Sequence, residues 1–76
     1  MVLVHIKVFN QEKQYDVWIE EDCKVNDFLE DVVGSWLKKR YAYEHFLYHI
    51  DERKLLANQL SFKENHVIHS DQLILF

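Results

Sequence analysis

Two runs near the start of the chain alternate, with an apolar side chain at every second position. In the first run, Val2, Val4, Ile6 and Val8 share one side, which is the period of a strand. The second run covers residues 15–20, and the polar residues between the two runs are few enough for a hairpin loop. The pattern predicts an antiparallel hairpin with one apolar face.

After this hairpin the hydrophobic period lengthens to that of an α-helix. Apolar residues recur at three- and four-residue intervals, at Val25, Phe28, Leu29, Val32, Val33, Trp36 and Leu37. This spacing predicts one amphipathic helix that packs on a sheet. Its last turn is followed by Lys38, Lys39 and Arg40, which suit the negative end of the helix dipole. Gly34 is unfavourable inside a helix, and close packing against a neighbour would explain it.

The remaining pattern predicts three further strands. They cover residues 45–50, 54–56 and 72–76, with a helical turn near Phe62 in the irregular stretch 60–71. The order is two strands, a helix, two strands and a last strand, which is typical of the β-grasp. We therefore expect an α+β fold in which a mixed sheet of four to five strands packs on one helix.

Alternation within the predicted strands separates a core face from an outer face. In strand 45–50, Phe46, Tyr48 and Ile50 fall on one side, which we assign to the core, and Leu47 and His49 fall on the other. The predicted core residues are Val4, Ile6, Val8, Tyr15, Val17, Ile19, Val25, Phe28, Leu29, Val32, Trp36, Tyr48, Ile50, Leu56, Leu60, Ile68, Leu73 and Leu75.

Composition excludes several classes of protein. The chain is expected to form one domain, 1–76, and its 49% hydrophobic and 14% aromatic residues suffice for a compact core. A net charge of -4 would repel nucleic acid and anionic membranes. No apolar stretch approaches the roughly 20 residues that span a bilayer, and no signal peptide is recognisable. These features predict a cytoplasmic protein without membrane insertion.

The chemically reactive residues do not form a catalytic or metal-binding pattern. His45 and His49 would lie about 13 Å apart along one strand, and His66 and His69 have no CxxC motif beside them. Cys23 follows three acidic residues that disfavour its thiolate. We expect neither a metal nor another cofactor, and we expect no enzymatic activity.

Several segments together resemble the ubiquitin-like proteins. The segments are the N-terminal hairpin, the helix that begins at Val25, Lys54-Leu55-Leu56, and the ending Leu60-x-Phe62…Ile68-x-x-Asp71-x-Leu73-x-Leu75. Within that superfamily the chain is most similar to the YukD/EsaB group, through Lys24-Val25-x-x-Phe28-Leu29 and a last strand without Gly-Gly. The resemblance implies a sheet with its first and last strands parallel at the centre. It also implies an accessory or regulatory role in a type VII secretion system, whose substrates are of the WXG type.

The outer sheet face is the predicted binding site for a protein partner. Its predicted partner-binding residues are Leu3, His5, Trp18, Leu47, His49, Ile74 and Phe76. An exposed apolar surface with aromatic and histidine side chains resembles an interface core. The partner would be a secretion-system component, and self-association stays open. The alternatives are a modifier or sulfur carrier that lacks its Gly-Gly tail, or a docking domain cut from a larger secretion protein.

Overall fold

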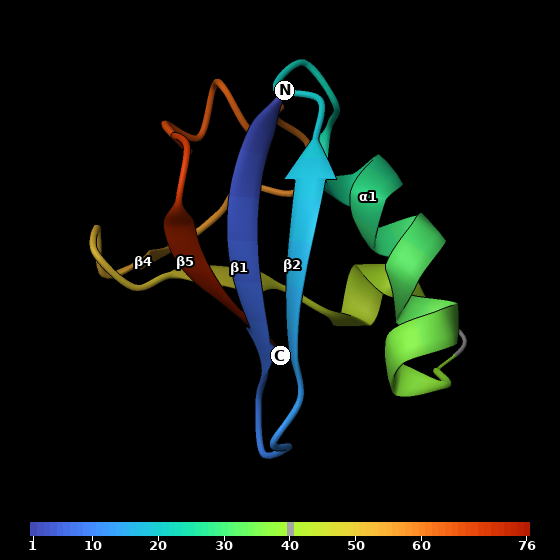
Figure 1. The fold of residues 1–76 in the computed structure, drawn as a ribbon. Coiled ribbons are helices and arrows are strands. Elements are labelled where there is room, and N and C mark those ends of the chain that lie inside the picture. Colours follow the sequence, from blue (N-terminus) through green and yellow to red (C-terminus); the bar gives the residue numbers. More distant parts are fainter. Residues whose placement is uncertain (40) are drawn as a thin grey trace.

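The structure is a computed structural model that describes residues 1–39 and 41–76. Arg40, one of the three basic residues predicted after the helix, lies outside the described residues. Five strands form one mixed sheet in the order β2-β1-β5-β3-β4 (Figure 1). They are β1 Val2–Val8, β2 Gln14–Ile19, β3 Leu47–His49, β4 Lys54–Leu55 and β5 Asp71–Leu75.

The first and last strands lie side by side in the middle of the sheet. β1 is antiparallel to β2 and parallel to β5, with Ile6 opposite Leu73. β3 is antiparallel to both β5 and β4. The predicted α+β architecture and the parallel central pair are therefore confirmed.

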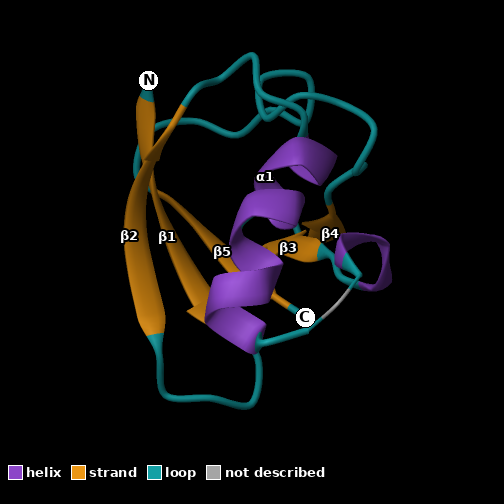
Figure 2. Ribbon diagram, turned by 90° about the vertical axis from the view of Figure 1, so that its right-hand side faces the viewer, coloured by secondary structure: helices purple, strands orange, loops and turns teal. Residues whose placement is uncertain are grey.

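One face of this sheet is covered by the helical segments (Figure 2). They are α1 Val25–Val32, the π-helical turn η1 Val33–Leu37 and the 3-10 turn η2 Ala42–Glu44. The predicted stripe is buried or half-buried throughout, but the α-helical hydrogen bonding ends at residue 32 and a wider turn follows. Gly34, a poor helix former, lies in this turn. Gly34 is exposed. Apart from its own turn of helix, no atom of the described residues lies within 4 Å of where a Cβ would be, so the expected close packing is wrong.

The core lies between the sheet and α1. Its largest fully buried side chains are Phe62, Ile6, Leu29, Leu47, Leu73 and Leu75. Three predicted core residues are instead exposed, namely Ile50, Leu60 and Ile68. Ile50 follows β3 and projects to the same outward side as Tyr48. Leu60 and Ile68 lie in loop segments whose buried side chains are Phe62 and Val67 instead.

The segment before β5 is organised by a reciprocal pair of hydrogen bonds. The Ser61 N–H donates to Glu64 Oε1, and the Glu64 N–H donates to Ser61 Oγ, both at 3.0 Å. This is the capping-box arrangement, applied here to a turn rather than to a long helix. Asn65, also buried, bonds to both backbone groups of Ala57. The turn predicted near Phe62 is thus present, and polar contacts hold it against the core.

Candidate protein-interaction surface

The strand β3 presents the opposite faces from those predicted. Leu47 is 0% exposed and His49 2% exposed, so neither lies on the outer face. The reason is the pairing with β5, which places Leu47 opposite Leu75 and His49 opposite Leu73. Directly opposite residues in an antiparallel pair project to the same side, and both leucines of β5 are in the core. The assignment of Leu47 and His49 to a contact surface is therefore wrong.

His49 is a core histidine with both ring nitrogens occupied. Its Nδ1 accepts the Glu52 N–H at 3.2 Å, which leaves Nε2–H to donate to Asp71 Oδ2 at 2.7 Å. The same carboxylate oxygen accepts the Ile68 N–H at 2.8 Å. The pair thus ties the turn after β3 to the turn before β5, and satisfies polar groups that burial would otherwise penalise.

On the opposite face, apolar side chains from β3, β4 and β5, from residues that flank β3 and β5, and from the β1–β2 hairpin loop adjoin. Register places Ile74 opposite Tyr48 and Tyr48 opposite Leu55. Phe76 exchanges two backbone hydrogen bonds with Phe46, and its ring centroid is 4.8 Å from that of Phe9 and 6.4 Å from that of Tyr48. We call these residues the aromatic patch, and they are Phe9, Phe46, Tyr48, Leu55, Ile74 and Phe76.

The aromatic patch is exposed although its members touch one another. Phe46 and Phe76 are 42% and 41% exposed, Phe9 and Leu55 more so, while Tyr48 and Ile74 are half-buried. No helix or strand of the described residues covers this face. Of the predicted site residues, only Ile74 and Phe76 belong to the patch. The alternation of Phe46 and Tyr48 with Leu47 correctly places Phe46 and Tyr48 on one face of the strand. That face is the outer one, and not the core face that the sequence analysis predicts.

Three further predicted site residues, Leu3, His5 and Trp18, lie on the same outer face, away from the aromatic patch. Leu3 pairs with Trp18 and His5 pairs with Asp16 across β1 and β2. Between the pair of Leu3 and Trp18 and the aromatic patch lies a polar contact, His5 Nδ1 to Asp16 Oδ1 at 2.7 Å. The hydrogen bond with His5, and a second from Gln14, hold the pKa of Asp16 below its ordinary value of 3.8. The outer face therefore has two separate apolar ends.

Apart from the two His–Asp pairs, the groups that could perform chemistry do not come together in the described residues. The Cys23 thiol donates to the Lys24 carbonyl at 3.3 Å, and burial, followed by the charges of Asp27 and Asp31, raises its pKa. That shift disfavours the reactive thiolate at neutral pH. Across residues 1–39 and 41–76, no three His, Cys, Asp or Glu side chains gather to hold a metal, and there is no pocket. Within the same residues, no helix is long and apolar enough to cross a bilayer.

Comparison with solved structures identifies the architecture. The N-terminal ubiquitin-like domain of the 4931431F19Rik protein superposes with a TM-score of 0.77 at 15% identity, over 99% of this chain and 72% of that one. The fold is ubiquitin-like. The ubiquitin of Caldiarchaeum subterraneum also superposes on the present chain, with a TM-score of 0.75 at 13% identity, over 97% of this chain and 89% of that ubiquitin.

A third neighbour comes from an assembly of two proteins. It belongs to the crystal structure of ATBAG1 in complex with HSP70, with a TM-score of 0.78 at 13% identity. The match covers 100% of this chain and 40% of that one. No protein-family model and no curated protein matches the sequence. None of these comparisons addresses the resemblance to the YukD/EsaB group, which stays a prediction from the sequence.

Proposed function

We propose that this ubiquitin-like domain is a non-enzymatic adaptor that binds a protein partner through the aromatic patch. The observation that carries the proposal is the patch itself, where six apolar side chains adjoin on the face that α1 leaves uncovered. Contiguous exposed apolar surface of this kind marks interaction sites, and aromatic residues are enriched in interface cores. The neighbour from a complex of two proteins is consistent with a protein as the partner.

The proposed partner is a cytoplasmic component of a type VII secretion machine. This part rests on the resemblance of the helix motif to the YukD/EsaB group. In the structure the motif serves the core, because Val25 and Leu29 are fully buried and Phe28 lies edge-on to Phe62 at 5.4 Å. The secretion role is therefore tested through the partner and not through substitutions in the motif.

The experiment measures binding of the full chain to the cytoplasmic domains of the secretion machine encoded in the same genome. Isothermal titration calorimetry compares the native chain with the double variant Ile74→Ser, Phe76→Ser. We expect the double variant to bind at least about tenfold more weakly, since interface aromatics contribute most when they are central. Its free energy of unfolding should stay within about 1 kcal/mol of the native value, because neither side chain is in the core.

The matched control is Trp18→Ser, which removes an exposed aromatic from the other end of the same face. This variant should bind the secretion component as the native chain does. If the double variant folds and binds normally, the aromatic patch is not the interface. If it unfolds, its side chains belong to the core. If the native chain binds none of these domains, the secretion role is wrong.

A further inference from the structure

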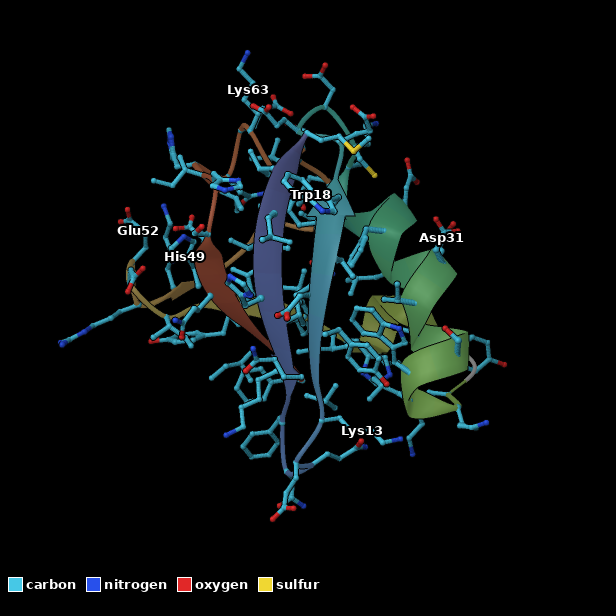
Figure 3. The ribbon with its side chains drawn as sticks, viewed as in Figure 1. Lys13, Trp18, Asp31, His49, Glu52 and Lys63 are labelled. Carbon is cyan, nitrogen blue, oxygen red and sulfur yellow. The ribbon has the colours of Figure 1, made fainter. Side chains whose placement is uncertain are left out.

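The second apolar end of the outer face is built around an exposed tryptophan. Trp18 is 61% exposed and stands opposite Leu3, near the N-terminal end of β1 (Figure 3). The His69 ring leans against it, with centroids 5.6 Å apart and planes tilted by 37°. The Leu3 N–H donates to His69 Nδ1 at 3.2 Å, which holds that ring in place. We call Trp18, Leu3 and His69 the tryptophan surface.

The tryptophan surface is distinct from the aromatic patch. Trp18 stands opposite Leu3, whereas Ile74 stands opposite Lys7. Leu3 and Lys7 are four positions apart in β1, which is about 13 Å along a strand. The His5 contact with Asp16 lies between them. A single small partner element that fills one end therefore leaves the other uncovered.

The charges beside Trp18 favour a cation. Asp16 shares its face of β2, one alternate position away, or about 7 Å. Its side chain is 58% exposed, and the hydrogen bonds with His5 and Gln14 both use Oδ1, so Oδ2 stays available as an acceptor. Exposed Glu20 follows Trp18 by two residues. The N-terminal ammonium of Met1 is paired with Glu21 at 3.7 Å. His69, whose ring contacts Trp18, uses its Nδ1 lone pair to accept the Leu3 N–H, so this nitrogen carries no proton.

From this arrangement we infer that the tryptophan surface binds an arginine side chain of a partner protein. The guanidinium stacks on the outward face of the Trp18 indole and donates to Asp16 Oδ2. Tryptophan is the best aromatic acceptor of a cation, and the planar guanidinium stacks on rings while it donates to a carboxylate. The inference goes beyond the proposed function, because it assigns a second surface and a second kind of contact. An adaptor with both surfaces would bridge two different proteins, so the arginine belongs to a protein other than the secretion component.

The test uses nuclear magnetic resonance of the labelled full chain with two short peptides. One is Gly-Arg-Gly-Arg-Gly, and in the other citrulline replaces each arginine, which keeps the shape and removes the charge. The arginine peptide should shift the Trp18 indole N–H resonance in a saturable way, while Trp36, stacked on Tyr15 at 3.9 Å, stays unchanged. Trp18→Leu and Asp16→Asn should each weaken binding about fivefold, and salt should weaken it further.

Controls distinguish this inference from the proposed function. The double variant Ile74→Ser, Phe76→Ser should bind the arginine peptide normally even though it loses the secretion component. The inference is overturned if the citrulline peptide shifts the Trp18 resonance equally, or if Trp18→Leu binds as tightly as the native chain. It is also overturned if phosphatidylcholine vesicles shift that resonance and the arginine peptide does not, since the ligand would then be a lipid headgroup.

Discussion

Two histidine–aspartate contacts have the same length, 2.7 Å, and lie on opposite faces of one sheet. His49 and Asp71 are buried on the inner face, where further backbone donors complete their hydrogen bonds. His5 and Asp16 lie on the outer face, where water can replace either partner. The comparison teaches that an identical contact has different consequences on the two faces. Inner-face groups maintain the fold, whereas outer-face groups can exchange their contacts for those of a partner.

The largest expected difference between the faces concerns two phenylalanines. Phe62 is fully buried, and Phe62→Ala should cost about 3–5 kcal/mol of unfolding free energy because a cavity remains. Phe76→Ala on the outer face should cost less than about 1 kcal/mol. Urea unfolding of both variants measures the contrast. Equal losses would show that the aromatic patch is part of the core.

Neighbouring residues of β3 sharpen the comparison within one strand. Leu47→Ala should cost about 2–5 kcal/mol, because the side chain is fully buried opposite Leu75. Tyr48→Ala should cost clearly less, because Tyr48 is half-buried on the other face. Thermal unfolding followed by circular dichroism measures both. The reverse order would mean that β3 presents Leu47 outward after all.

The two histidine–aspartate pairs provide the next contrast. Asp71→Asn should cost about 1–3 kcal/mol, since a neutral amide oxygen accepts from His49 and from the Ile68 N–H more weakly than the charged carboxylate oxygen does. Asp16→Asn should leave the unfolding midpoint unchanged within error, because its side chain is exposed. Amide exchange at Ile68 should accelerate only in the Asp71 variant. Similar behaviour of the two variants would remove the distinction between the faces.

The smallest expected effect is the acid response of Glu64. The Ser61 N–H, followed by the Ser61 hydroxyl, holds the pKa of Glu64 below its ordinary value of 4.5. A group with a lowered folded pKa contributes stability above its unfolded pKa, and this contribution is lost as the pH falls through the folded value. Glu64→Gln keeps the acceptor but cannot titrate. Because the two Ser61 hydrogen bonds favour the ionised carboxylate, the unfolding midpoint of this neutral variant should lie slightly below the native one at neutral pH, and the difference should shrink as the pH falls below 4.5.

The comparison of the native chain with Glu64→Gln has two outcomes that would contradict this prediction. If the native chain and Glu64→Gln lose stability in parallel through the acid range, other carboxylates account for the response. If Glu64→Gln is as stable as the native chain at neutral pH, the acceptor oxygen of Glu64, and not its charge, supports the turn. Either result separates the capping contact from its titration.

The fold was predictable from long regular patterns, and the candidate site was not fully so. β1 has seven residues, and every second one is a buried β-branched residue. This long alternation makes clear which side of β1 faces the core. In β3 only three residues are paired, with an apolar residue on each side. Local alternation could not distinguish the two sides there, and the assignment of Tyr48 to the core was wrong for that reason.

The sequence alone determined the order of elements, the amphipathic helix stripe and the parallel central strands expected from the ubiquitin-like resemblance. The order of elements and the helix stripe depend on periods that persist over many residues, so that one arrangement buries far more apolar surface than any other, whereas the parallel central strands were implied by the resemblance alone. The tertiary structure alone decided which side of β3 faces inward. Hydrogen-bond register with β5 places Leu47 beside Leu75, and this brings Phe46 and Tyr48 to the aromatic patch.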